Sequence, residues 1–311
     1  MDRRREEVPE CASAHQWWSS RRNRVTNQVE GGGPTVLRIV LGSQLRRLRE
    51  EKGISRDEAG YHIRASGSKI SRLETGKVGF KLRDVEDLLS LYGVEETEPR
   101  SALLSLAKQA NTPGWWHKFG DVMPEWFQAY IGLEAAATLI RTYEVQFVPG
   151  LLQTEDYVRA IASGQPGITP EQVDQRVSLR TRRQQLLSRP NAPRLWAVID
   201  EAALRRSIGS REVMRGQIER LIEATKLPNV TLQLLPFSAG VHAGEAGAFT
   251  LMRFPEPDLP DLIYLEQLTS ALYLDKPELV EHYIEAMERL CIESDTPDRT
   301  VASLGKILQE I

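Results

Sequence analysis

The chain has 311 residues, of which 41% are hydrophobic and 27% are charged, and its formal net charge is -3. That length predicts roughly two domains. No apolar stretch approaches the ~20 residues that cross a membrane, and the opening MDRRREEVPE leads into no apolar core of a secretory leader. The two cysteines, Cys11 and Cys291, have no zinc-finger or disulfide-framework spacing. We therefore expect a cytoplasmic protein that does not contact a membrane.

Residues 1–35 precede the first periodic segment and are expected to form a disordered tail. Basic clusters at Arg3–Arg5 and Arg21–Arg24 flank a stretch with no helical or strand period. Gly31–Pro34 interrupts whatever precedes it. No apolar face is available there to stabilise a fold.

Residues 36–112 are expected to form an all-α domain of about five short helices. Leucines recur at helical spacing from residue 37 to residue 48. Gly53 ends this first helix, and Ser55 with Glu58 has the spacing of a capping box that begins the second. Three more helices follow, beginning after Ser66, near residue 82 and near residue 99.

Residues 113–311 mix helical and strand periods, which predicts an α+β domain with a small antiparallel sheet. The helical candidates are residues 127–141, 154–163, 170–188, 210–226 and 277–292. The strand candidates are residues 195–200, 230–235, 248–254, 262–266 and 272–274. No repeat period is present, so a solenoid is not expected.

Charge is distributed unevenly along the chain. Residues 36–94 carry twelve Lys and Arg against eight Asp and Glu, a local excess of +4, whereas residues 95–311 carry a net -8. A compact basic unit joined to a larger acidic one predicts that the first unit meets a polyanion.

The segment from Ser55 to Lys77 has the pattern of two short helices joined by a tight turn. Apolar positions in both helices are expected to form one shared seam, made of Ala59, Ile63, Ile70 and Leu73, with Leu45 and Leu48 of the first helix completing it. The other face of the second helix carries small, polar and basic residues and no acid before Glu74. A slender basic helix that a rigid partner holds outward fits a major groove ~12 Å wide.

This segment resembles the DNA-binding domain of the XRE family, the lambda and 434 repressor-like helix-turn-helix proteins. ISRLETGK, residues 70–77, is similar to the family hallmark at the end of the recognition helix. The resemblance implies base-facing positions at Gly67, Ser68, Lys69 and Arg72. It implies phosphate contacts from Arg56, Lys77, Lys81 and Arg83. It also implies that Arg49 and Glu74 form an internal, structural ion pair.

Two positions depart from the family pattern. Arg64 stands where the turn usually has glycine, so the turn either avoids positive φ or is strained. Gly60 stands where the helix usually has alanine. In addition, Gly67 offers no side chain to a base, which weakens readout at that position.

The larger half of the chain carries a second resemblance. Five stretches are similar to the domain that follows the helix-turn-helix in the Scr/WhiJ-like antitoxin-type regulators of sporulating, filamentous bacteria: residues 114–122, 143–160, 200–206, 230–237 and 259–278. The resemblance implies a transcriptional regulator, often paired with a small co-encoded partner protein. It does not identify what the domain binds.

No catalytic, metal or cofactor signature emerges from residues 113–311. His242 and Glu245 lie in the Gly-rich loop AGVHAGEAG, but no Ser or Cys is placed to act with His242 as a nucleophile. A metal site needs three or four ligands, and His117 and His282 belong to unrelated segments. We therefore expect neither enzyme activity nor a cofactor.

These patterns predict a sequence-specific transcriptional regulator that binds double-stranded DNA with its third helix in the major groove. A homodimer is expected, because one short recognition helix reads few base pairs. The α+β domain is expected to sense a partner protein or a small molecule. Two alternatives stay open: an antitoxin-like protein that neutralises a small partner, and a repressor gated by a small molecule in an apolar cavity.

Overall fold

The computed structural model of the chain describes residues 34–95, 97–255 and 259–311. The expected tail at residues 1–35 therefore lies almost wholly outside the described residues. Its last two residues, Pro34 and Thr35, belong to the first helix instead. Within the described ranges, no helix combines the length and the apolar character that spanning a bilayer requires.

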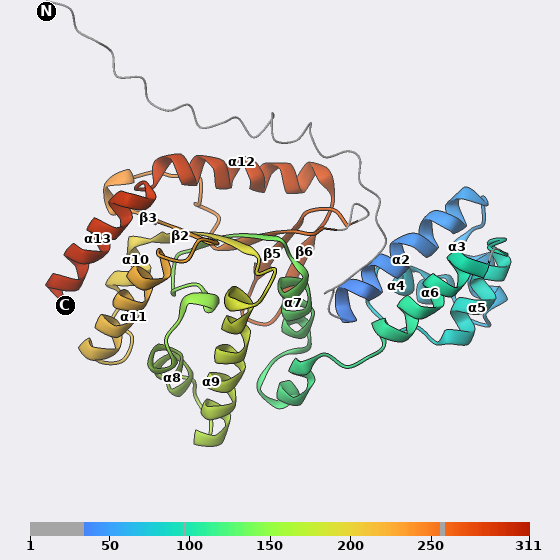
Figure 1. Cartoon of the computed structure of the whole chain (residues 1–311), viewed down its shortest axis with the longest axis horizontal. Coiled ribbons are helices and arrows are strands. Elements are labelled where there is room, and N and C mark those ends of the chain that lie inside the picture. The colour runs from blue at the N-terminus through green and yellow to red at the C-terminus, as the bar shows by residue number, and fades with distance from the viewer. Residues whose placement is uncertain (1–33, 96, 256–258) are drawn as a thin grey trace, which may run out of the picture. The chain divides into compact units, whose positions relative to one another are not determined.

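Five helices come first among the described residues, as the sequence predicts for residues 36–112 (Figure 1). They are α2 (Pro34–Glu51), α3 (Arg56–His62), α4 (Gly67–Glu74), α5 (Leu82–Leu91) and α6 (Thr97–Ala110). All five contribute buried apolar side chains to one core, among them Leu45, Ala59, Leu73, Leu89 and Ala107. Each buried leucine contributes about 1.5–3 kcal/mol relative to an exposed one. We refer to residues 34–110 as the helical region.

Residues 115–311, the α+β region, contain a six-stranded sheet in the order β3-β2-β1-β4-β5-β6. The strands are β1 (Leu139–Glu144), β2 (Arg194–Asp200), β3 (Val230–Leu235), β4 (Phe249–Arg253), β5 (Leu262–Glu266) and β6 (Ala271–Leu274). The pairs β1–β4, β4–β5 and β5–β6 are antiparallel. The α+β class and the mostly antiparallel sheet are thus confirmed.

Two strand pairs, β1–β2 and β2–β3, are parallel, which the sequence analysis did not anticipate. Parallel neighbours need long crossover connections, which are usually helical. The connection from β1 to β2 contains α8 (Glu155–Ser163) and α9 (Pro170–Gln184), and that from β2 to β3 contains α10 (Glu201–Arg205) and α11 (Arg211–Ala224). The remaining helices are α7 (Glu125–Ala136), α12 (Pro277–Glu293) and α13 (Pro297–Glu310), with short 3-10 helices η1 (Trp115–Val122), η2 (Gly150–Leu152), η3 (Gln185–Ser188) and η4 (Phe237–Ala239).

Helices cover both faces of the sheet. Helix α12 lies along one face, and α7, α9 and α11 lie on the other (Figure 1). Accordingly, Met287 of α12 is buried with Tyr143 of β1, whereas Ile140 of β1 shares a core with side chains from α7, α9, α11 and α13. Successive strand residues point to opposite faces. Glu144 at the end of β1 therefore points to the face that α7 and α9 cover.

The sequence analysis predicted a helix over residues 127–141, and its predicted end was wrong. It stops at Ala136, and residues 139–144 form β1 between β2 and β4. The alanines of residues 135–137 followed by Leu139 and Ile140 continue a helical period, but hydrogen bonding to two neighbouring strands overrides it. Helix α13 was also not anticipated, although Thr296 as its cap and Pro297 at its first position are clear signals.

Helix α2 contributes to two cores. Leu37 and Leu41 are buried with the other helices of the helical region. Val36 and Val40 are buried in the core of the α+β region, together with Trp116 and side chains of α7. One helix therefore joins the packing of both regions. The expected domain boundary between residues 112 and 113 stays a prediction.

Candidate nucleic-acid interface

Helices α3 and α4 begin with equivalent serine caps. Ser55 Oγ accepts a hydrogen bond from the Glu58 amide at 3.1 Å, and Ser66 Oγ accepts one from the Lys69 amide at 3.3 Å. Such a cap satisfies an amide that the helix leaves free and contributes about 0.5–2 kcal/mol. The caps fix the residue at which each helix begins, and so determine which side chains point outward.

The seam predicted between the two helices is present. Ala59, Ile63, Ile70 and Leu73 are 0%, 8%, 1% and 2% exposed. Gly60 lets α3 approach the turn closely, because a methyl group added there would lie 2.8 Å from the Ala65 carbonyl oxygen. The glycine in place of the family's alanine therefore has a steric reason.

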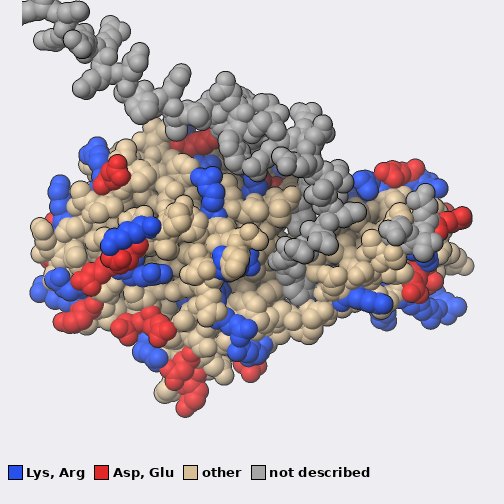
Figure 2. Space-filling model, viewed as in Figure 1, with Lys and Arg blue, Asp and Glu red and all other residues tan. Residues whose placement is uncertain are grey.

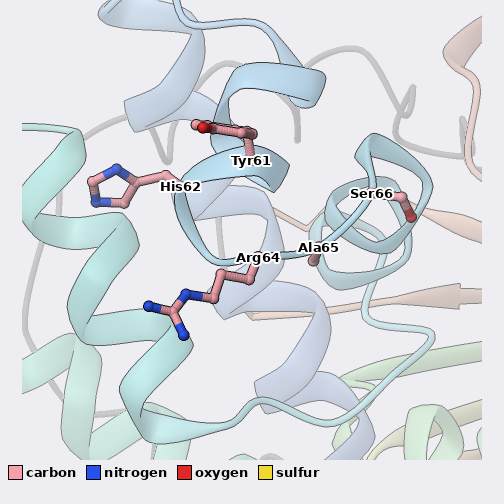
Figure 3. Close-up of a pocket in the computed structure, with 5 residues that line it drawn as sticks. All are labelled: Tyr61, His62, Arg64, Ala65 and Ser66. Atoms are coloured by element: carbon pink, nitrogen blue, oxygen red, sulfur yellow. The ribbon is translucent and has the colours of Figure 1, made fainter.

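The turn between the helices is strained at Arg64, the second of the two geometries that the sequence left open. Its φ is +55°, in the left-handed region, and its amide donates to the Tyr61 carbonyl at 3.0 Å. A non-glycine residue pays about 1–2 kcal/mol for this conformation. In Figure 3 the Arg64 and His62 side chains extend to the same side of the turn. They line an open hollow of about 670 Å³ together with Tyr61, Ala65 and Ser66.

The predicted base-facing residues of α4 differ in their freedom. Ser68 and Arg72 are exposed, and no carboxylate of the described residues lies within ion-pair distance of Arg72. Lys69 is partly buried, and its Nζ donates to Asp84 Oδ2 at 2.6 Å. Because Asp84 lies in the first turn of α5, this pair ties α4 to α5. Lys69 must leave Asp84 before it reaches a base.

Gly67, the fourth predicted base-facing residue, lies against an acid. A methyl group added at this position would overlap the carboxylate of Asp57 in the first turn of α3. Glycine therefore makes room for Asp57 at the start of α4. The structure gives Gly67 a packing role that the sequence analysis did not foresee.

Two arginines share one buried carboxylate behind α4. Arg49 Nε donates to Glu74 Oε1 at 2.5 Å, and Arg56 Nε donates to Glu74 Oε2 at 3.0 Å. The Arg49 and Glu74 side chains are 7% and 3% exposed, whereas that of Arg56 is 44% exposed. The hydrogen bond that Arg49 donates to Glu74 raises the pKa of Arg49. Arg56, predicted to contact a phosphate, is thus held by Glu74 with much of its side chain in solvent.

The other predicted phosphate-contacting cations border the connection from α4 to α5. Lys77 follows α4, Lys81 immediately precedes α5 and Arg83 lies in its first turn, and all three are exposed. Arg83 Nε lies 3.8 Å from Asp87, too far for a strong pair. Figure 2 shows Lys and Arg side chains at the surface of the helical region, on the right of the view, with Asp and Glu among them.

Sequence reasoning missed the acids that lie beside the predicted contacts. Asp57 and Asp84 each stand in the first turn of a helix, where an acid is favoured by the helix dipole and needs no other explanation. Nothing local in the sequence pairs Asp84 with Lys69, which lies fifteen residues earlier. Only the packing of α5 against α4 brings these groups together.

Comparison with protein families gives two matches. A helix-turn-helix domain matches residues 40–103, which include the capped helices and the seam described above. This match indicates a DNA-binding regulator. A domain of unknown function, DUF5753, matches residues 127–306. No curated protein and no solved structure gives a match. Since the second match covers more than half of the chain, the protein belongs to the DUF5753 family, here with a helix-turn-helix domain before that domain.

Proposed function

We propose that the protein is a sequence-specific transcriptional regulator that places α4 in the major groove of DNA. The observation that carries the proposal is Arg72, which is exposed on α4 while Ile70 and Leu73 of the same helix are buried. A bidentate arginine–guanine contact is the commonest specific contact in the major groove. Ser68 lies beside it at the exposed start of the helix.

Phosphate contacts from exposed cations around α4 would supply most of the affinity. Arg56, Lys77, Lys81 and Arg83 are the candidates, at the start of α3 and along the connection from α4 to α5. Such contacts position a protein on the duplex without reading its sequence. Lys69 adds a contact if DNA draws it away from Asp84.

The test compares two arms of one titration. Genomic fragments that co-purify with the full chain supply the specific duplex, and a scrambled duplex supplies the reference. Arg72→Ala should lower affinity for the specific duplex by about 1–3 kcal/mol, roughly 5–150-fold, and change random binding little. Lys77→Ala should weaken both alike and reduce the salt slope by about one unit.

The matched control is Lys108→Ala, which removes an exposed cation of α6, outside α3, α4 and their connections. It should leave both affinities unchanged. Equal loss of specific and random binding in Arg72→Ala would contradict the placement of α4 in the groove. Absence of binding to any genomic duplex at low salt would contradict the proposal as a whole.

We further propose that the regulator acts as a homodimer, since one α4 reads few base pairs. Two half-sites 10–10.5 base pairs apart, centre to centre, would then be protected from cleavage. Light scattering of the free protein, and footprinting of the selected fragments, test this. A monomer on a single unrepeated site would contradict it.

The α+β region is proposed to control DNA binding through α2. This helix supports α3 and α4 with Leu41 and Leu45, and its Val36 and Val40 are buried in the core of the α+β region. A change in the packing of α7 or η1 therefore reaches α2 directly. Gel shifts with and without a co-encoded small protein test whether such a partner changes DNA binding, as expected of this regulator. In an antitoxin-like adaptor, the partner should bind the protein equally well when α4 is mutated.

A further inference from the structure

Within the described residues, three arginines of the α+β region have a buried nitrogen without a hydrogen-bond partner: Arg141, Arg176 and Arg183. Of these three residues, only Arg183 is itself buried. Arg183 of α9 donates to Glu134 of α7 through Nε at 2.9 Å and through Nη2 at 2.7 Å. Both side chains are almost fully buried, at 3% and 2% exposed. Its Nη1 is also buried, and no hydrogen bond within the described residues satisfies it. A buried donor without a partner destabilises a fold, so this one needs an explanation.

A second guanidinium lies next to that nitrogen. Arg180 precedes Arg183 by three residues and therefore shares its face of α9. A methyl group built on Gly150 of η2 would lie 2.5 Å from Arg180 Nη1 and 3.4 Å from Arg183 Nη1. Both nitrogens thus lie near one point above Gly150, where any side chain would displace Arg180 and contact Arg183. We name Arg180, Arg183 and Gly150 the two-arginine site.

The ring of Phe127 keeps the two cations in place. The guanidinium carbons of Arg183 and Arg180 lie 5.0 Å and 6.0 Å from its centroid, and that of Arg183 lies 5.4 Å from the centroid of Tyr130. Such contacts attract a cation to the ring face. They hold two like charges together without supplying the negative charge that would neutralise them.

Glu134 and Glu266 both attract the two arginines, but within the described residues no carboxylate accepts a hydrogen bond from Arg183 Nη1. Glu134 is fully engaged by Arg183, and within the described residues no carboxylate lies within ion-pair distance of Arg180. Burial, and then the charge of Glu266, raises the pKa of Glu144 to about 8, so this partly buried acid is mostly protonated at neutral pH. Glu266 is exposed, and its Oε2 accepts from the Tyr264 hydroxyl at 3.0 Å.

Arg180 stays charged and reachable. Burial, and then the like charge of Arg183, lowers its pKa to about 10, which still leaves the guanidinium protonated at neutral pH. Its side chain is only partly buried. A solute can therefore contact Arg180, whose Nη1 lies near the buried Nη1 of Arg183.

We propose that the two-arginine site binds the anionic oxygen group, a carboxylate or a phosphate, of a small molecule. Arg180 donates from the accessible side, and Arg183 donates through its unpartnered Nη1. Guanidinium groups suit both anions because their donors match pairs of oxygens. This inference rests on the proposed function and names the chemical class of the effector. Binding of the anion to the two-arginine site does not require DNA.

The test is thermal unfolding of the full chain, without DNA, in three sodium salts of equal ionic strength at pH 7: chloride, phosphate and succinate. A tenfold excess of a bound anion over its Kd should raise the Tm by roughly 2 °C above the value in chloride. The phosphate and succinate arms distinguish the two sources of the anionic group. Titration calorimetry with the active anion then gives its affinity directly.

Three variants separate this site from general anion effects. Arg180→Gln should lose the response. Gly150→Ala should weaken it at least several-fold, although it changes no charge, because the methyl displaces Arg180. Arg176→Gln, which removes a partly buried arginine of the same helix that pairs with Gln165, should keep the response.

Equal Tm values of the wild type in all three salts would overturn the proposal. So would an undiminished response in both Arg180→Gln and Gly150→Ala. If Arg180→Gln does not fold, Gly150→Ala still decides the matter. Because no DNA is present, a failure of the DNA titrations described above leaves these outcomes unaffected.

Discussion

The strained turn of the helix-turn-helix offers the sharpest prediction on stability. Arg64 has a φ of +55°, which costs an L-residue about 1–2 kcal/mol. Glycine removes this cost but loses about 0.5–1 kcal/mol of conformational entropy on folding. Arg64→Gly should therefore stabilise the protein by about 0.5–1 kcal/mol.

The measurement is urea unfolding of the full chain, followed by circular dichroism of the helices. Arg64→Ala is the matched control, since it removes the same guanidinium but keeps a β-carbon in the left-handed region. The glycine variant should be more stable than the alanine variant by about 1 kcal/mol. If the two variants unfold at the same urea concentration, the strain assigned to this turn is absent and the reasoning is wrong.

Measuring the DNA affinity of the same two variants would test why an arginine remains in a strained turn. Strain persists in proteins chiefly where function needs it. If the guanidinium contacts a phosphate, both variants should lose affinity equally and reduce the salt slope by about one unit. If only the glycine variant loses affinity, the rigidity of the turn matters and the charge does not.

Three further predictions concern charged groups. Asp84→Asn should release Lys69, and so raise the affinity for random DNA and steepen its salt dependence in anisotropy titrations. Unchanged titrations would mean that Lys69 does not reach the duplex. Glu74→Ala should cost about 3–5 kcal/mol in urea unfolding, because buried Arg49 then keeps only the half-exposed Glu50, 3.3 Å away, as a counterion. A loss below 1 kcal/mol would contradict that role. Between pH 5 and 8 the native state keeps a proton on Glu144 that the unfolded chain has released. This group therefore makes the free energy of unfolding fall as pH rises, on the order of 1 kcal/mol per pH unit. Glu144→Gln should abolish this part of the fall.

Local signals in the sequence predicted most of the helix-turn-helix. The caps at Ser55 and Ser66 and the seam of Ile63 and Ile70 depend on residues within one or two turns, so spacing alone reveals them. The strain at Arg64 was foreseen as one of two geometries, because a non-glycine residue stood at a position that favours positive φ. The outcome between them depended on how closely α3 and α4 pack.

Features that depend on distant residues escaped prediction. Residues 139–141, the first half of β1, were assigned to a helix because their partners in β2 and β4 lie more than fifty residues later in the chain. Arg183 and Glu134 are forty-nine residues apart, and neither position has a neighbour that suggests the other. Glu134 and Gly150 meet Arg180 and Arg183 only once the chain is folded, which is why the two-arginine site has no sequence signature.

The double role of α2 constrains how the DNA-binding half can be isolated. A truncated chain ending near residue 112 would strip the cover from Val36 and Val40, which are 0% and 3% exposed in the full protein. Two solvent-exposed valines on adjacent turns add apolar surface that favours self-association. Recombinant work on the isolated half would then report an artefactual oligomer, unless both valines were first replaced by polar residues.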